Sequence, residues 1–350
     1  MRIPVDVARR ICRAVFASLP TPEHIADVVT EALVEADLRG IDSHGIRLLP
    51  LYADRAANGQ LIPSAEPATV RETATTTVLD ARQGVGHYAS TVTMGHACDK
   101  ASRHGLGAAV VRQNNHNGAL SHFAIQAARR GLIGIAATAC APRVTPYGGR
   151  TGLHGTNPIA YAVPRGEADP MVFDFSTGYS AAKLKAAADR GEPLPAGRFL
   201  NAAGEPSTDL KDLATGWILP VAGPIGFGLG LLVDVLTCAL ADSPIGRQIP
   251  DVKNTSGPYH GCFFSLAIDP GAFSGPAPFS GRVEALLEQV RATEPADPGQ
   301  PVRYPGQRGW EIRRQRLRDG IPMDEAVWNK LLAELDDRGI DVASRRVGKS

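Results

Sequence analysis

The spacing of hydrophobic residues changes along the chain and divides it into helical and mixed regions. In residues 5–19 and 21–40, apolar side chains recur three and four positions apart, which predicts amphipathic helices. The second of these stretches begins with Thr-Pro-Glu, a typical helix start. Residues 43–59 continue the helical pattern up to Asn58-Gly59, whereas residues 69–81 alternate with a period of two and predict a strand or hairpin.

The centre of the chain alternates between the two patterns. Helices are predicted at 88–105, 118–131 and 180–191, and strands at 106–112, 132–139, 157–164, 170–175 and 263–269. Residues 191–219 are rich in Gly, Pro and polar residues and predict loops, and the tail returns to helix as far as Arg338. We therefore predict an α/β protein with a helical domain built from 1–68 and 300–350, and a central α/β domain at 69–299.

Composition narrows the class of protein. The 350 residues are 43% hydrophobic with a net charge of +1, which suits a globular protein and gives no electrostatic reason to expect nucleic acid. Arg9, Arg10 and Arg13 interrupt the apolar run that a signal peptide needs, so we expect a cytoplasmic protein. The five widely spaced cysteines indicate reduced thiols, no metal-binding cluster is evident, and residues 226–241 predict a buried helix, with no membrane association.

Candidate chemistry begins with two histidines. His44 lies in Ser-His-Gly, and His116 lies in the polar turn QNNHNG between a predicted strand and a predicted helix. Histidine is the usual acid/base side chain near neutral pH, and a loop on a rigid scaffold is a common place for one. The alternative is that the asparagines only form the turn and both histidines are bystanders. His122 is expected at the surface of the following helix.

Two glycine-rich segments could approach a ligand closely. One is PYGGRTGLHGTNPIAYAVP at 146–164, and the other is PVAGPIGFGLG at 220–230, whose helix start would attract a phosphate or carboxylate. Turns in the first and close helix packing in the second explain them equally well. Neither GLGAAV at 105–110 nor GFGLG at 226–230 forms the GxGxxG fingerprint of a Rossmann fold.

Taken together, the motifs resemble the type-2 malate/L-lactate dehydrogenase family, which includes ureidoglycolate, sulfolactate and diketogulonate dehydrogenases and cyclic imine reductases. The resemblance runs in order through RGIDSHG, NNHNGA, PYGG, GTNPIAYAVP, VFDFST, LPAG, GEPSTD, ILPVAGPIGFGLGLLVDVL and YPGQRG. Within the family, NHNGALSHF, SPIGRQI and YPGQ look most like ureidoglycolate dehydrogenase.

The resemblance implies a non-Rossmann, sulfolactate-dehydrogenase-like fold and a homodimer that uses NAD or NADP to interconvert small 2-oxo and 2-hydroxy acids, or the corresponding imines. It also implies roles for individual residues. His44 and His116 would be catalytic; Ser43, Arg47, Thr156 and Asn157 would bind the carboxylate substrate; and His116, Cys140, Thr156, Asp174, Phe175, Ser176, Gly223 and Ile225 would contact the cofactor. Which histidine gives the proton stays open.

Three departures from the family pattern matter. Ile225 stands where the family has a lysine, and a branched apolar side chain cannot pair with an anionic oxygen. Leu48 replaces the usual arginine, which leaves Arg47 one position earlier. Ser176-Thr177-Gly178 and Lys183-Leu184 replace Ala-Thr-Ser and Gly-Lys. The competing hypotheses are therefore a relative that has lost nicotinamide use and performs a non-redox proton transfer or elimination, and a non-catalytic binder of a small acid.

Overall fold

The computed structural model describes residues 1–250 and 257–340. The helices are α1 Val5–Ser18, α2 Glu23–Leu38, α3 Leu49–Ala57, α4 Gly86–His104, α5 Ser121–Ala128, α6 Ala181–Asp189, α7 Leu210–Thr215, α8 Pro224–Asp234, α9 Pro276–Ala292, α10 Gln307–Asp319 and α11 Glu325–Asp336. The strands are β1 Arg2–Ile3, β2 Ala68–Glu72, β3 Thr76–Asp80, β4 Leu106–Asn114, β5 Ile133–Ala139, β6 Ile159–Arg165, β7 Ala168–Phe175, β8 Phe199–Leu200, β9 Pro206–Ser207, β10 Trp217–Ile218, β11 Gly261–Ile268 and β12 Ile321–Pro322.

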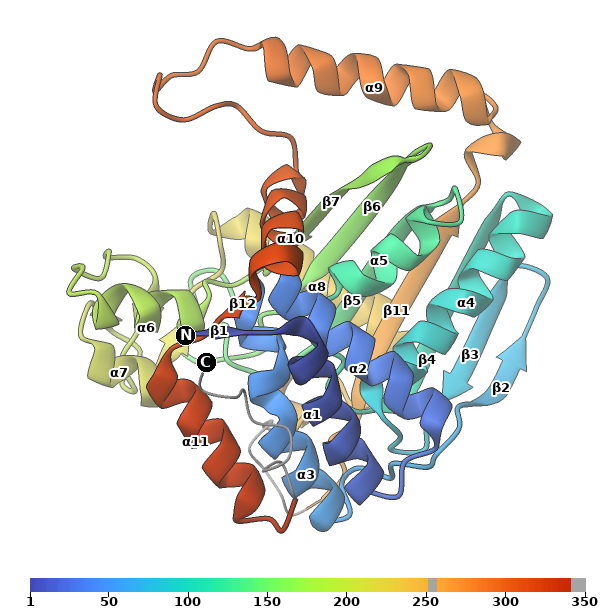
Figure 1. Cartoon of the computed structure of the whole chain (residues 1–350). Helices are drawn as coiled ribbons and strands as arrows, with labels where there is room; N and C mark the ends of the chain where they lie inside the picture. Colours follow the sequence, from blue (N-terminus) through green and yellow to red (C-terminus); the bar gives the residue numbers. More distant parts are fainter. Residues whose placement is uncertain (251–256, 341–350) are drawn as a thin grey trace.

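A mixed sheet forms the centre of the molecule, in the order β2-β3-β4-β11-β5-β6-β7. β3 and β4 pair in parallel and the other neighbours are antiparallel. Alternate residues of the strands enter two different cores, because successive side chains of a strand point to opposite faces. Val111, Ala136 and Phe263 pack on the face covered by α4 and α5, whereas Val110 and Phe264 pack towards α8 (Figure 1). The predicted mixed-sheet α/β fold is confirmed.

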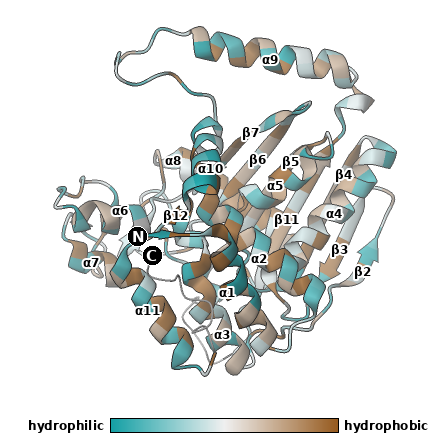
Figure 2. Ribbon diagram, viewed as in Figure 1, coloured by the Kyte–Doolittle hydropathy of each residue, from teal (hydrophilic) through white to brown (hydrophobic). Residues whose placement is uncertain are grey.

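Segments from both ends of the chain share a separate core. Apolar residues of α1, α2, α3 and α11 are packed together there, and β1 pairs with β12 beside them (Figure 1). Figure 2 shows hydrophobic residues among these helices and on the central strands, whereas α10 is largely hydrophilic. Trp310 of α10 nevertheless joins the core of the sheet. Residues 341–350 of the predicted helical domain lie outside the described residues.

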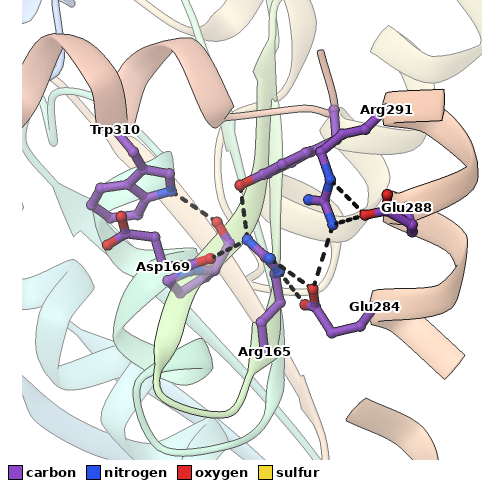
Figure 3. Close-up of polar contacts among 8 residues, drawn as sticks. Arg165, Asp169, Glu284, Glu288, Arg291 and Trp310 are labelled. Carbon is purple, nitrogen blue, oxygen red and sulfur yellow. Dashed lines mark hydrogen bonds and ion pairs between the residues drawn. The ribbon is translucent and has the colours of Figure 1, made fainter. Parts of the chain in front are cut away.

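The start of α10 is fixed to the hairpin of β6 and β7 (Figure 3). Arg165 donates to both carboxylate oxygens of Glu284 in α9, at 2.5 and 2.9 Å, and to Tyr304 Oη at 2.8 Å. Trp310 Nε1 donates to Pro170 O at 2.8 Å, and Val172 N donates to Pro305 O at 3.1 Å. The YPGQ segment at 304–307 is therefore held against β7. None of the described helices has both the length and the apolar character that a membrane span requires.

Candidate active site

Most of the predicted site segments lie beyond one end of the strands of the central sheet. Strand pairing places the ends of β4, β5 and β7 and the beginning of β6 next to one another, through the pairs Gly261–Asn114, Cys262–Ala139, Ala137–Ile159 and Ile159–Phe175. The turn with His116 follows β4, Cys140 follows β5, the Gly-Thr-Asn-Pro segment precedes β6, and Asp174 is the last residue but one of β7. The register of the sheet therefore gathers segments that are far apart in the sequence.

His44 does not lie on a continuous helix. Asp42–His44 and Ile46–Leu48 form two short 3-10 turns, and α3 begins only at Leu49, so the prediction of a helix from residue 43 is wrong at its start. The cause is Gly45, which packs so closely against Asp37 that an added Cβ would overlap the carboxylate. Asp37 Oδ2 accepts a hydrogen bond from the backbone N–H of Ile46 at 2.9 Å, and burial raises the pKa of this carboxyl to about 7.

The rings of His44 and His116 are stacked on each other. Their centroids are 5.9 Å apart and their planes are inclined by 14°. Each Nδ1 is held by a hydroxyl group: Ser43 Oγ lies 2.9 Å from Nδ1 of His44, and Tyr52 Oη lies 2.8 Å from Nδ1 of His116. Neither Nε2 has a hydrogen-bond partner within residues 1–250 and 257–340. Each ring therefore offers its Nε2 to a ligand.

Burial keeps both rings neutral near pH 7. Desolvation lowers the pKa of His44, although the charge of Asp174 acts in the opposite direction. The pKa of His116 lies well below its usual value, because of burial first and then because of the neighbouring His44 and His87. A neutral imidazole can accept a proton, and an anionic ligand placed next to it would raise its proton affinity.

Sequence reasoning missed two residues that complete this cluster. Tyr52, on α3, holds His116 from a position 64 residues earlier in the chain. His87, at the start of α4, packs its ring edge against both Tyr52 and His116. Tyr52 belongs to the stretch RGIDSHGIRLLPLY, but its pairing with His116 has no local signal. His122, expected at the surface, is partly buried, and burial lowers its pKa to about 4.

Asp174 belongs to the proposed cofactor segment, and its charge acts on His44. Its Oδ2 accepts a hydrogen bond from the backbone N–H of Ser121 at 2.8 Å, at the start of α5, while the side chain remains exposed. Phe175 stacks on Phe173, with centroids 5.0 Å apart. Ser176 Oγ is occupied internally, because it donates to Thr156 O at 3.1 Å and to Gly178 O at 2.6 Å.

The Gly-Thr-Asn-Pro segment is tied to α8 by Asn157. This buried side chain accepts a hydrogen bond from Cys140 N at 3.0 Å and donates to Gly230 O and to Asp234 Oδ1, both at 2.9 Å. Burial raises the pKa of Cys140 to about 11, so its thiol is protonated at neutral pH. Asn157 therefore orders the segment, and Thr156 beside it is only partly buried.

The start of α8 lies next to this segment and exposes apolar side chains. Val221 N donates to Thr177 O at 2.9 Å. This hydrogen bond joins residues 220–226 to the loop that follows β7. Ile225 is 65% exposed and Tyr147, which lies beside Gly223, is 63% exposed. On the other side of the site, Arg47 is exposed and makes no hydrogen bond or ion pair with the part of the chain that the structure describes.

This architecture is that of a class of dehydrogenases with a mixed sheet in place of the Rossmann fold. The sequence model of the malate/L-lactate dehydrogenase family matches residues 3–332. The chain is 33% identical over 320 residues to ureidoglycolate dehydrogenase (NAD(+)) from Escherichia coli O157:H7, covering 89% of each protein. It therefore belongs to the malate/L-lactate dehydrogenase family, as the resemblance of its motifs implied.

Solved structures agree with this assignment. Sulfolactate dehydrogenase from Methanocaldococcus jannaschii superposes with a TM-score of 0.91 and 28% identity, covering 98% of this chain and 99% of that one. Delta1-piperideine-2-carboxylate reductase from Pseudomonas syringae gives a TM-score of 0.84 at 27% identity, covering 95% and 99%. The predicted sulfolactate-dehydrogenase-like fold and the prediction of a dehydrogenase are both confirmed.

Proposed function

We propose that this chain is an oxidoreductase that transfers a hydride between NAD or NADP and a small 2-oxo or 2-hydroxy acid, or a cyclic 2-imino acid, with histidine as the acid/base. The observation that carries the proposal is the stacked pair His44 and His116, each with Nδ1 held by a hydroxyl group and Nε2 without a protein partner. Two such neighbouring groups suit a reaction in which a proton moves to or from the oxygen or nitrogen atom bonded to the carbon that exchanges the hydride.

The chemistry follows from the neutral state of the rings. Oxidation of a hydroxy acid requires a base to take the hydroxyl proton, and a neutral Nε2 has the lone pair for this. In the reverse direction, the alkoxide needs a proton, and the histidinium that donates it also stabilises the developing negative charge. The substrate carboxylate would raise the proton affinity of the nearby rings, and Ser43, Thr156 and the long, exposed side chain of Arg47 are the proposed groups that orient it.

The residues present suit part of a nicotinamide dinucleotide. The bound nicotinamide would accept the hydride from a hydroxy acid or supply it to an oxo acid, and the protein would orient it. The exposed carboxylate of Asp174 has the acceptor oxygens that ribose hydroxyls need, and the exposed ring of Tyr147 offers a stacking face. The N–H groups of Gly223, Ile225 and Gly226 donate to Pro220 O, Ala222 O and Val221 O, so the start of α8 would contact the cofactor mainly through its surface shape. Ile225 adds no charge there.

A second candidate function is motivated by Ile225. Its 65% exposed side chain presents an apolar group where a cation would pair with the cofactor. A family member that uses the histidine pair for a non-redox proton transfer or elimination would keep the histidines and lose this contact.

The test is to mix the purified protein with NADH or NADPH and follow cofactor fluorescence. We expect a change in fluorescence on binding, and loss of absorbance at 340 nm when a panel of 2-oxo acids and cyclic imines is added. If neither cofactor changes its fluorescence, and calorimetry nevertheless shows that a 2-oxo acid binds, the redox function is rejected in favour of the second candidate.

We also propose a homodimer. α8 and the turn after it expose Leu231, Leu232, Val235 and Leu240, which are 37%, 47%, 50% and 54% exposed and form one apolar stripe of a helix. A second copy of the chain would cover this stripe, because hydrophobic surface of this kind is unfavourable in water. Sedimentation velocity should give twice the monomer mass, and Leu232→Asp should give the monomer; a monomeric wild-type protein rejects the proposal.

A further inference from the structure

His87 is a third histidine of the cluster and has an unusual environment. It lies in the first turn of α4, is 1% exposed, and neither of its ring nitrogens has a hydrogen-bond partner within the described residues. A neutral imidazole always carries one N–H donor and one lone pair. Buried polar groups in proteins are nearly always paired, so an imidazole with two unpaired nitrogens requires an explanation.

His87 packs against Tyr52 and, slightly farther away, against His116. Its ring centroid lies 5.6 Å from that of Tyr52 and 6.4 Å from that of His116, with interplanar angles of 83° and 76°. Gly118 provides the space for this ring: an added Cβ at Gly118 would lie 2.5 Å from Nε2 of His87. The polar turn that presents His116 is therefore shaped around His87.

The hydrogen bond between Tyr52 and His116 can be arranged in two ways. If Tyr52 donates its hydroxyl hydrogen to Nδ1, neutral His116 carries its own hydrogen on Nε2 and cannot accept a proton there. If Nδ1–H donates to Tyr52 Oη, Nε2 is free to accept a proton. The histidinium form also needs this second arrangement, since both of its nitrogens carry hydrogen. In both catalytic forms the hydroxyl hydrogen of Tyr52 needs another acceptor.

We propose that His87 is a positioning residue that accepts the hydroxyl hydrogen of Tyr52 and thereby selects the tautomer of His116 with a free Nε2. This inference rests on the proposed function, which assigns proton transfer to His116 or its neighbour. The rings of Tyr52 and His87 are already in edge contact, and rotation of the His87 ring towards the hydroxyl group is the movement that this proposal requires. His87 then contributes to catalysis through Tyr52 and His116 without touching the substrate.

The charge state of His87 suits an acceptor. Burial lowers its pKa to about 3, with smaller effects from His122 and His44, so its lone pair is available at neutral pH. Other titratable or charged groups act on the neighbours of His87: Arg55 on His116, Asp174 on His44, and Tyr259 and Cys12 on Tyr52. No carboxylate among the described residues has a resolved influence on the pKa of His87.

The experiment compares His87→Phe, which keeps a ring but removes both nitrogens, with His87→Gln, which restores an acceptor. Nitrogen-15 NMR of the full-length protein reports the tautomer of His116 without any substrate. We expect the Nδ1–H tautomer in the wild type, the Nε2–H tautomer in His87→Phe, and recovery of the wild-type tautomer in His87→Gln. Turnover should fall about tenfold in His87→Phe with KM nearly unchanged, as expected for one lost hydrogen bond.

A matched control separates this role from packing. Thr77 on β3 is 2% exposed and its Oγ1 is also unpaired, but it lies in the sheet away from the cluster. Thr77→Val should raise the melting temperature, because it removes a buried unpaired hydroxyl group. His87→Phe should not gain stability in this way, because it also removes the acceptor of the Tyr52 hydroxyl group. Only His87→Phe should lower turnover.

An unchanged His116 tautomer in His87→Phe overturns the proposal, and His87→Leu provides the same comparison if the phenylalanine variant does not fold. The proposed function fails by a different result, namely full activity of both His44→Asn and His116→Asn. The NMR comparison then still decides whether His87 controls the tautomer.

Discussion

The two halves of the candidate site are built in opposite ways. In the half around His44 and His116, polar side chains are held by one another, through the exposed Ser43 and the buried Tyr52, with the buried His87 beside them. In the half around the start of α8, the backbone is well ordered by hydrogen bonds but the side chains that reach the surface, Tyr147 and Ile225, are uncharged and exposed.

The difference indicates how each half of the site would position its ligand. Proton transfer needs donor and acceptor atoms fixed before the substrate arrives, and hydrogen bonds between side chains provide this. Contacts to a ligand made by backbone groups and exposed aromatic or apolar side chains depend mainly on shape, so they tolerate substitution. Mutations in the histidine half should therefore affect turnover, and mutations in the α8 half should affect affinity.

The largest effect is expected from His116→Asn and His44→Asn. General acid/base catalysis contributes roughly 10²- to 10⁴-fold to turnover, so the variant that lacks the acid/base should lose activity by that factor while the other loses less. Steady-state kinetics with a 2-oxo acid and NADH or NADPH measures both. Circular dichroism and the melting temperature serve as controls for folding. Wild-type turnover in both variants would remove histidine from the mechanism.

Much of the fold could be predicted from the chain because its signals are local. The helix predicted from the Thr-Pro-Glu start forms as α2, and the helix predicted to close at Gly105 ends there as α4, with Gly105 at φ +82°. The turn at Asp42–Leu48 could not be predicted, because its cause is the close approach of Gly45 to Asp37 on another element.

The composition of the site was harder to predict than its location. His44 and His116 were found because they occur in recognisable motifs, and the sheet register then brings the segments together. Tyr52 and His87 were missed because their roles consist of contacts across 64 and 29 residues. Such contacts leave no periodicity in the sequence, and only the packing of α3 and α4 around the turn reveals them.

A smaller effect is expected from Ile225→Lys, which places a cation at the start of α8. If this position faces the cofactor, the ammonium group should tighten binding of NADH or NADPH, by about tenfold for one exposed charge-assisted contact. Fluorescence titration at two salt concentrations measures the change, which salt should weaken. Val70→Lys is the matched control: Val70 is 50% exposed on β2, so this substitution adds the same charge at a surface position outside the site. Equal affinities in the two variants would place Ile225 outside the cofactor site.

The smallest expected effect is on the stability of the fold, and it develops only as the pH falls below 6.5. The pKa of His87 is about 3 in the folded protein and near 6.5 when the chain unfolds, so the unfolded state binds more protons between these values. This group therefore destabilises the fold as pH falls below 6.5, by roughly 2–3 kcal/mol at pH 4.5. His122, with a pKa of about 4, acts in the same direction.

The comparison must be made between the wild type and His87→Phe, because other groups act in the opposite sense. The pKa of Asp37 is raised to about 7 and that of Asp234 to about 6, so both bind protons more readily in the folded protein and stabilise it on acidification. These contributions are common to both proteins and cancel in the difference. Calorimetry from pH 7 to pH 4.5 should show a smaller loss of stability in His87→Phe, and parallel curves would mean that the His87 ring takes up a proton in the folded state.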